Sequence, residues 1–414
     1  MASADDFYDA LETREPTERE AAQMGALPEH IAHAMTEAPA FAEILAGVRP
    51  QEIDSREALA QLPVTRKSDL SERQAETPPF GGLAAVAPAA VSRIFVSPGP
   101  IFEPATERRD YWRLARAFHA AGFRAGELVH NSFAYHLTPG GWMMDDGARS
   151  LGCSVFAAGV GNSEQQVEAI AHLRPTGFAG TPDYLKVLLD KASELGADCS
   201  SIDKALVSGG ALFPSLRDDY AQRGVAVLQC YATADLGLIA YESGAREGMI
   251  VDEEIIIEIV RPGTGDPVAE GEVGEVVVTA FNPDYPLIRF ATGDLSAVLP
   301  GASPCGRTNM RLKGWLGRAD QTTKVKGMFV HPSQVAEVVK RHPEILRARL
   351  EVDRADESDV MRLFCEVEGA PAGPAAAIAD SLQAVCKMKG EVEIVAPDSL
   401  PNDGKVIDDK RCYD

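Results

Sequence analysis

The feature that most constrains the fold is an alternation of short apolar runs with amphipathic helical segments between residues 94 and 208. Strand-like runs bounded by turn residues lie at 93–97, 128–131, 154–158 and 177–180, and helix-like segments lie at 110–121 and 184–192. This alternation predicts right-handed β-α-β units and a parallel sheet. Runs at 205–210 and 225–231 repeat the strand pattern, and the first of them ends in glycines. Because parallel sheets place ligand loops at the carboxyl ends of their strands, we expect a site at these two ends.

The regions on either side of this core differ in texture. Residues 1–75 are charged and helical in pattern, with Pro28 predicted near the first turn of a helix and Ser68 as a candidate cap. Residues 76–92 indicate a loop. After residue 248, β-rich runs at 255–260, 274–279 and 287–290 predict a small antiparallel sheet or barrel, and mixed strand and helix signals follow from residue 320 to the end. The sequence therefore predicts an α/β protein with a large N-terminal unit, a β-rich subdomain within it and a compact α+β C-terminal domain.

Charge and composition exclude several classes of partner. The chain of 414 residues is long enough for two or three domains, and its formal net charge is −22, which argues against a general nucleic-acid binder or a protein held on anionic lipid. No apolar run reaches the roughly 18 residues that a bilayer span needs, and the first residues are acidic, unlike a secretory signal. We expect a cytoplasmic protein that binds neither nucleic acid nor membrane. Its seven cysteines are scattered without a C-x-x-C pair, which favours reduced thiols over disulfides or a zinc site.

Several C-terminal motifs resemble the adenylate-forming superfamily, and within it the phenylacetate–coenzyme A ligase family. Residues 314–338 read GWLGRADQTTKVKGMFVHPSQVAEV, similar to that family's Gly-Arg-x-Asp element, its following strand and its aromatic-Val-x-Pro-Ser-Gln segment. Upstream, residues 286–295 (PLIRFATGDL) resemble its Arg-(Tyr/Phe)-x-Thr-Gly-Asp element, and CGRT at 305–308 lies between the two. The opening helices with LPVTRKSDL at 62–70, and the Gly404-Lys405 pair, also look alike. The resemblance covers nearly the whole chain.

The resemblance implies a two-domain enzyme and a two-step reaction. It implies a large AMP-binding domain at residues 1–319, a small mobile lid domain at 320–414, and a homodimer. A small carboxylic acid, aromatic or otherwise, would attack the α-phosphate of ATP to give an acyl-adenylate, and coenzyme A would then displace AMP. Such chemistry rests mainly on positioning and on neutralising the charge of the phosphates, to which Mg²⁺ contributes through one or two carboxylates.

The resemblance also assigns roles to individual residues. It makes Lys405 the cation of the adenylation step, Asp235 a catalytic Mg²⁺ ligand and Asp320 the hinge. Asp294 and Arg318 would bind the ribose, and Tyr231 would stack on adenine. The remaining candidates are the nucleotide-pocket residues Ser208, Gly209, Gly210, Ala232 and Thr233, the phosphate-loop residues Ser97 and Gly99, and the acyl-pocket residues Tyr135 and His136.

The chain departs from the family at two places. Where the family has Tyr-Gly-x-(Ser/Thr)-Glu, this chain has YATAD at 231–235, so the hydroxyl residue is missing and the metal-binding acid is one methylene shorter. At the phosphate loop the chain reads VSPGPIFEP at 96–104. Each of its three prolines removes a backbone N–H donor and Glu103 would repel phosphate, so only Ser97 and Gly99 keep the phosphate-binding chemistry.

These departures keep two alternatives open beside an AMP-forming acyl-CoA ligase. The first is a family member that binds a carboxylate or acyl-adenylate without completing catalysis. The second is an enzyme that passes the acyl group to a carrier-protein thiol, which the hinge motif does not distinguish from transfer to coenzyme A.

Overall fold

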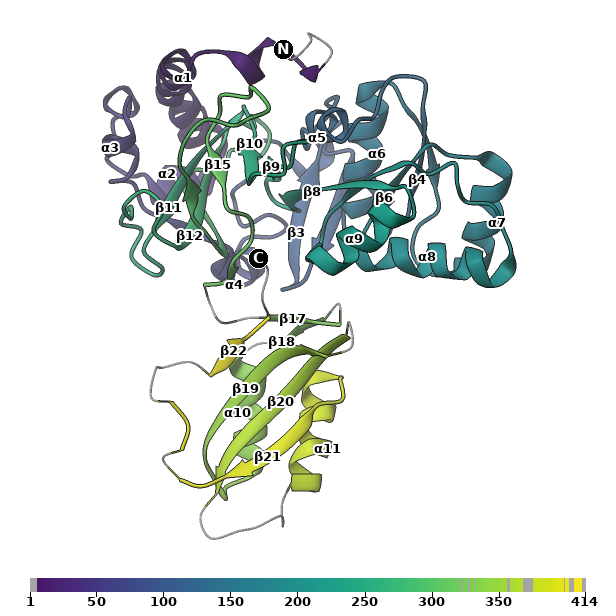
Figure 1. Ribbon diagram of the computed structural model, residues 1–414. Coiled ribbons are helices and arrows are strands. Elements are labelled where there is room, and N and C mark those ends of the chain that lie inside the picture. Colours follow the sequence, from purple (N-terminus) through teal and green to yellow (C-terminus); the bar gives the residue numbers. More distant parts are fainter. Residues whose placement is uncertain are drawn as a thin grey trace. The chain divides into compact units, whose positions relative to one another are not determined.

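The computed structural model describes residues 6–319, 321, 323–326, 328–330, 332–355, 358–367, 375–397, 399–401 and 406–411. The chain divides into two compact units, Met1–Trp315 and Leu316–Asp414 (Figure 1). Both units combine helices with sheets, as the predicted α/β class requires.

The predicted parallel sheet is present in the first unit. Its parallel strands run in the order β5-β4-β6-β7-β8, and β9, β10, β15 and β14 extend it beyond β8 in antiparallel fashion. The bounds are β4 (Leu128–Asn131), β5 (Ser154–Ala157), β6 (Gly177–Gly180), β7 (Lys204–Val207), β8 (Ala226–Thr233), β9 (Gly237–Tyr241), β10 (Met249–Val251), β14 (Val298–Leu299) and β15 (Arg311–Leu312). The glycines after β7 and the YATAD segment at the end of β8 therefore lie at neighbouring carboxyl ends.

Helices cover both faces of this sheet, and the alternation of strand side chains explains why. On β7, Leu206 packs into one core with α5 (Ala115–Ala120) and α6 (Gly140–Leu151). Its neighbours Ala205 and Val207 face the opposite core, which α7 (Ser163–Leu173), α8 (Pro182–Leu195) and α9 (Pro214–Gln222) complete. Successive strand residues point to opposite faces, so a strand buried on both sides is apolar throughout. The helix predicted at 110–121 begins only at Ala115, because Asp110 and Arg113 adopt positive φ angles of 50° and 62°.

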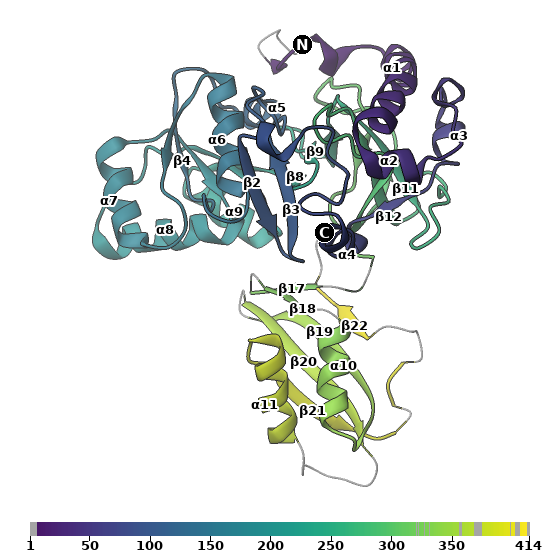
Figure 2. The same cartoon turned by 180° about the vertical axis from the view of Figure 1, so that it is seen from behind.

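A second sheet in this unit has the order β1-β13-β12-β11 and packs against the N-terminal helices (Figure 2). Its strands are β1 (Thr65–Arg66), β11 (Ile255–Val260), β12 (Gly274–Ala280) and β13 (Phe290–Ser296), and α1 (Pro16–Glu37) and α2 (Pro39–Ile44) cover it. The strand predicted at 287–290 instead begins at Phe290, because Arg289 has a φ of 45° and turns its buried guanidinium to the Glu258 carboxylate, 3.0 Å away. The strand consequently carries Asp294 within it.

Two local predictions in the N-terminal half are wrong, and a third is right only in part. Pro28 lies inside α1, which opens at Pro16, where proline is better tolerated because the N–H of the first turn has no helical acceptor. Ser68 caps no helix, since its hydroxyl donates to the Asp69 carboxylate 2.8 Å away, and α4 (Leu70–Glu76) has no side-chain cap. The run at 93–97 forms the predicted strand, β2 (Arg93–Ser97), but this strand pairs with β3 (Ile101–Ala105) outside the parallel sheet. The short connection through Pro98, Gly99 and Pro100 allows only an antiparallel pairing.

The second unit has its own core. Its sheet has the strand order β21-β20-β19-β22. A separate antiparallel hairpin of β17 and β18 precedes these strands in the sequence. The bounds are β17 (Thr323–Val325), β18 (Met328–Val330), β19 (Ile345–Ala355), β20 (Ser358–Val367), β21 (Glu391–Val395), β22 (Ile407–Asp409), α10 (Pro332–Arg341) and α11 (Ala375–Cys386). Val338 of α10 and Leu382 of α11 share a cluster with Leu350 and Leu363, so both helices cover one face of the sheet.

The remaining elements are short. In the first unit they are η2 (Ala10–Thr13), η3 (Pro50–Glu52), α3 (Arg56–Leu59), η4 (Lys67–Asp69) and η5 (Pro88–Ala90), and in the second unit the short strand is β16 (Gly317–Arg318).

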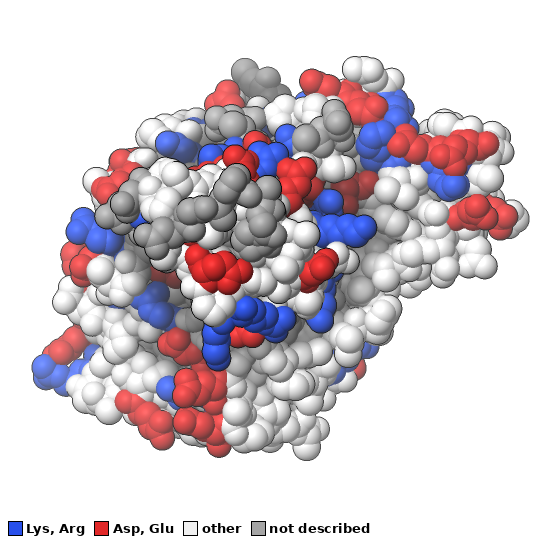
Figure 3. All heavy atoms as spheres, turned by 90° about the horizontal axis from the view of Figure 1, so that it is seen from below, with Lys and Arg blue, Asp and Glu red and all other residues white. Residues whose placement is uncertain are grey.

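The surface and the thiols are unremarkable for such a fold. On the face shown in Figure 3, acidic and basic side chains lie interspersed among uncharged ones. Among the described helices, none combines the length and the apolar composition needed to cross a bilayer. Six of the seven cysteines fall in the described part of the chain, and all six are free thiols.

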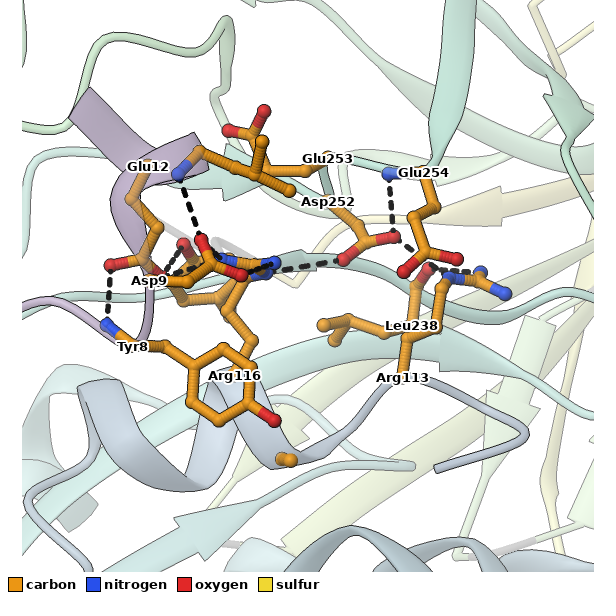
Figure 4. A network of polar contacts seen from close by, with 12 residues as sticks. Tyr8, Asp9, Glu12, Arg113, Arg116, Leu238, Asp252, Glu253 and Glu254 are labelled. Carbon is orange, nitrogen blue, oxygen red and sulfur yellow. Dashed lines mark hydrogen bonds and ion pairs between the residues drawn. The ribbon is translucent and has the colours of Figure 1, made fainter. Parts of the chain in front are cut away.

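A buried ion network joins the N-terminal segment to both sheets of the first unit (Figure 4). The Arg116 guanidinium donates to both carboxylate oxygens of Asp9, at 2.9 and 3.0 Å, and its Nε lies 3.6 Å from Asp252. Arg113 Nε donates to the other Asp252 oxygen at 2.7 Å, and Arg19 Nε donates to the adjacent Glu253 at 2.8 Å. Apart from Asp9, whose side chain is 36% exposed, these charged groups are buried, so each depends on its partner for the solvation that water no longer provides.

We expect Arg113→Met to destabilise the first unit by about 3 kcal/mol or more, because Asp252 would lose its closest cation inside the protein. Urea unfolding followed by circular dichroism measures this. The matched control is Arg174→Met, which breaks an exposed ion pair with Asp198 and should cost less than about 1 kcal/mol. Equal losses in the two variants would show that the network contributes no more than a surface pair.

The buried His30 should make stability depend on pH. His30 lies on α1 and its ring packs against Phe281. This burial lowers the pKa of His30 to about 4, with a smaller contribution from the charge of His33. A histidine whose folded pKa is depressed stabilises the fold fully above its unfolded pKa of about 6.5, and this stability is lost as the pH falls toward 4. Between pH 7.5 and 4, His30→Leu should therefore lose about 3 kcal/mol less than the parent in urea unfolding. The exposed His172→Leu should behave like the parent, and a parallel pH profile for His30→Leu would contradict the prediction.

Candidate active site

The turn that follows β8 holds Asp235 in a fixed position. Arg113 Nη2 donates to the carbonyls of Leu236 and Leu238, at 2.7 and 3.0 Å, and Thr233 Oγ1 accepts the Leu236 amide at 3.2 Å. Gly237 has a φ of 75°, and a side chain on it would approach the Trp112 carbonyl oxygen to 2.7 Å, so this position requires glycine. The same Arg113 that belongs to the ion network thus supports the acidic turn.

Asp235 pairs with a lysine from a distant segment. Its fully buried carboxylate accepts a hydrogen bond from Lys67 Nζ through Oδ2, while Oδ1 has no hydrogen-bond partner. Burial alone would lower the pKa of Lys67, but the neighbouring carboxylates of Asp235, Glu103 and Asp294 raise it, so Lys67 stays an ammonium group. Sequence reasoning noted the segment at 62–70 without assigning a role to Lys67, because nothing local shows that it meets a residue 168 positions away.

Tyr231 and Asp294, which come from separate motifs, meet directly. The Tyr231 hydroxyl donates to Asp294 Oδ2 at 2.7 Å, and the indole Nε1 of Trp315 donates to Asp294 Oδ1 at 3.0 Å. Both oxygens of the Asp294 carboxylate are therefore held by aromatic side chains from two other segments of the chain. Sequence analysis missed Trp315 as a member of this cluster, although it lies in the GWLGRAD motif that carries the resemblance.

The glycine-rich stretch after β7, residues 208–210, lies between the end of β8 and the aromatic segment at 133–136. Ser208 is buried, and its hydroxyl donates a hydrogen bond to the Cys230 carbonyl at 2.8 Å. This bond joins the end of β7 to β8 directly before Tyr231, which Ala232 follows. Gly209 has a φ of 72°, and a Cβ there would lie 3.5 Å from the Phe133 ring. Gly210 similarly lies against Pro182. Gly209 therefore lies beside the aromatic segment at 133–136, in a backbone conformation that favours glycine.

The two acyl-pocket candidates differ in their surroundings. The Tyr135 hydroxyl donates to Asp145 at 3.1 Å and accepts from the Asn131 amide at 2.7 Å, and its ring packs edge-on against Trp142. Burial, followed by the Asp145 charge, raises the pKa of Tyr135 above its usual range. His136 is exposed. The structure thus fixes Tyr135 within the protein and leaves His136 at the surface.

The expected phosphate loop is a tight hairpin between β2 and β3. Ser97 is buried and its hydroxyl donates to Glu103 Oε1 across the hairpin. A side chain on Gly99 would collide with Ile101, at 2.6 Å, so the turn has no room for a larger residue. Burial raises the pKa of Glu103 to about 8, and the Asp235 carboxylate adds to the shift, while Lys67 and Ser97 oppose it.

The remaining candidates lie in the second unit. Arg318 lies in β16, and Asp320 and Lys405 lie outside the described residues. Across the described part of the chain, no group of three or more His, Cys, Asp or Glu side chains is placed to hold a metal ion. A cation at Asp235 would therefore be of the kind that needs few protein ligands, as Mg²⁺ is.

The amino-acid sequence of the chain is similar to that of several known enzymes. The family model described as AMP-binding enzyme matches residues 147–281. The phenylacetate–coenzyme A ligase of Thermus thermophilus is 31% identical over 357 residues, which cover 82% of this chain and 79% of the relative. That of Aromatoleum evansii is 28% identical, with 86% of this chain and 83% of the relative covered.

Solved structures agree with these relatives. The crystal structure of 2-hydroxyisobutyryl-CoA ligase with 2-HIB-AMP and CoA matches with a TM-score of 0.81 at 26% identity, over 100% of this chain and 94% of the other. The same ligase in its postadenylation state matches with a TM-score of 0.74 over 99% of this chain. The resemblance found in the sequence and the α/β fold class are thereby confirmed.

We expect the Lys67–Asp235 pair to be energetically coupled. Lys67→Met leaves a buried carboxylate without its cation and should cost about 3 kcal/mol, whereas the double variant with Asp235→Asn should cost about 2 kcal/mol less than the two single losses together. A double-mutant cycle in urea measures this. The exposed pair Arg49–Glu52 provides the control cycle, with an expected coupling under about 0.5 kcal/mol. Additive losses at Lys67 and Asp235 would contradict the ion pair.

Proposed function

Because the chain belongs to the phenylacetate–coenzyme A ligase family of AMP-binding enzymes, we propose that it is an AMP-forming acyl-CoA ligase for an aromatic or other small carboxylic acid. The observation that carries this proposal is the 2.7 Å hydrogen bond between Tyr231 and Asp294, which brings the two nucleotide motifs together. ATP and coenzyme A are the cosubstrates, consistent with the acyl-AMP and CoA bound to the structural neighbour.

The reaction has two steps. The carboxylate of the acid attacks the α-phosphate of ATP, a new P–O bond forms, and pyrophosphate leaves. The thiol of coenzyme A then loses its proton and attacks the acyl carbon, a thioester forms, and AMP leaves. Both steps are accelerated by holding the reactants in line and by opposing the charge that develops on oxygen.

We assign the nucleotide to the ends of β8 and β13. Asp294 would accept hydrogen bonds from the ribose hydroxyls, because Tyr231 and Trp315 hold its carboxylate in place through both oxygens. Tyr231 would offer its ring to adenine, next to the backbone of Ser208, Gly209 and Gly210. Arg318 would reach the ribose, and Asp320 would be the pivot of the second unit between the two steps.

Asp235 is the residue best suited to hold Mg²⁺. Its unpartnered Oδ1 is a buried oxygen ligand of the kind that Mg²⁺ binds, while Oδ2 is already held by Lys67. A cation bound there would neutralise phosphate charge. Lys67 itself places a second positive charge in the same area.

The acid would bind beside the aromatic segment at 133–136. Phe133 lies against Gly209, and Tyr135 is held in place by Asp145 and Asn131, so the wall that they form is rigid. Aromatic walls favour an acid whose remaining part is flat and apolar. This supports an aromatic acid over an acid that carries a second charged group.

We expect Lys405→Ala to lower adenylate formation by about 100-fold, because the α-phosphate would lose its cation during attack. Pyrophosphate exchange with a panel that includes phenylacetate and 2-hydroxyisobutyrate measures this step. Thioester formation from a synthetic acyl-adenylate should stay within about threefold of the parent, since the thiol attacks the acyl carbon in that step and not the α-phosphorus.

The matched control is Lys410→Ala, a lysine of the same unit that pairs with Glu351. An unchanged exchange rate in Lys405→Ala would remove this residue from the mechanism. A parent enzyme that exchanges pyrophosphate with no acid of the panel would contradict the proposed function itself.

A further inference from the structure

The hairpin of β2 and β3 has one face turned toward the protein interior, and Glu103 lies on it. Phe95 is opposite Glu103 and Ser97 is opposite Ile101 in the register, and all four side chains are buried. The alternate residues Ile94 and Phe102 are 48% and 40% exposed. Because side chains alternate along a strand, the backbone itself directs the Glu103 carboxylate inward.

Glu103 is one of three buried polar side chains here that have an atom without a hydrogen-bond partner. Oε2 of Glu103, Oδ1 of Asp235 and the hydroxyl of Tyr285 each have no hydrogen-bond partner in the described structure. Contacts place the hairpin beside the Asp235 turn: the Phe95 ring, opposite Glu103, packs edge-on against Trp112 with the ring centroids 5.9 Å apart, and the Trp112 carbonyl lies against Gly237. Both carboxylates also act electrostatically on Tyr285, and Asp235 acts on Glu103. Each such group costs about 1–3 kcal/mol when it is left unsatisfied, so this concentration requires an explanation.

The ligand that fits is a hard divalent cation. Carboxylate oxygens are what Mg²⁺ and Mn²⁺ prefer, and Mg²⁺ in phosphate-binding sites uses one or two carboxylates with water and phosphate oxygens completing its shell. The cluster sets two carboxyl groups against the single ammonium group of Lys67, so without a metal ion it offers little attraction to the phosphates of ATP. A divalent cation bound between the carboxyl groups would supply the positive charge that the phosphates need.

We propose that Glu103 is the second carboxylate ligand of the cation held by Asp235, so that this hairpin binds the phosphates of ATP through a metal ion instead of through backbone amides. The inference rests on the proposed function of Asp235 as a metal ligand. It gives one reason for both departures of the sequence. The prolines remove amide donors that a cation-mediated contact does not need, and a second carboxylate compensates for the shorter side chain at position 235.

The test is direct metal binding to the full chain without nucleotide. Mn²⁺ is titrated and the free ion is measured by electron paramagnetic resonance. We expect one site in the parent and at least tenfold weaker binding in both Glu103→Gln and Asp235→Asn. Glu103→Gln keeps the size of the side chain and its acceptor oxygen for Ser97, so the hairpin should stay folded, which near-ultraviolet circular dichroism checks.

The matched control is Glu107→Gln, an exposed acid two residues after β3, which should bind Mn²⁺ as the parent does. As a second readout, Mn²⁺ should raise the melting temperature of the parent and of Glu107→Gln but not that of Glu103→Gln.

Equal Mn²⁺ affinity in Glu103→Gln and the parent, or no Mn²⁺ binding by the parent at millimolar concentration, would overturn the inference. Either result can occur in a chain that still exchanges pyrophosphate, so the inference and the proposed function fail separately. A parent that binds Mn²⁺ through Glu103 but activates no acid would leave the metal site standing and remove the ligase assignment.

Discussion

The candidate site depends on Arg113. This one guanidinium pairs with Asp252 in the buried ion network and donates to the carbonyls on either side of Gly237. The network itself joins the N-terminal segment, α5 and the connection between β10 and β11. Since buried charges are costly unless they are fully paired, the network tolerates few alternative arrangements, and it positions the Asp235 turn relative to both sheets.

The electrostatic balance of the site follows from that placement. Lys67 is brought against Asp235 by η4 immediately after β1, while Glu103 approaches from the hairpin. One ammonium group therefore faces carboxylates from three parts of the chain, counting Asp294. Such a cluster is short of positive charge, which suits a site that works with a metal ion and a polyanionic substrate.

The proposed metal ligation by Glu103 would let the family's reaction proceed with an unusual phosphate loop. Relatives share the fold at a TM-score of 0.81, so the positions of the strands are preserved. Relative to the donor-rich loop that the resemblance implies, this chain carries Glu103 on the inward face of the hairpin, and prolines that include the exposed Pro98 and Pro100 of its turn. Strand alternation confines such changes to a single face, which lets the surrounding core stay unaltered.

Much of the architecture was readable from local pattern. Apolar runs at 128–131, 177–180 and 205–207 became buried parallel strands because continuous hydrophobicity between helices has few other solutions. The predictions failed where backbone conformation was decided by distant contacts. Arg289 delays the start of β13 because it reaches Glu258, and Pro28 is carried inside α1 because neighbouring residues such as Leu27 and Ile31 are buried in the core.

The candidate residues follow the same division. Sequence alone determined the residue types, their order along the chain, the resemblance and the two departures at 96–104 and 231–235. Only the tertiary structure decided that Tyr231 meets Asp294, that Lys67 meets Asp235 across 168 positions, and that Glu103 faces inward beside them. The reason is that strand register and crossover connections bring distant segments together, and neither is encoded within any short stretch of residues.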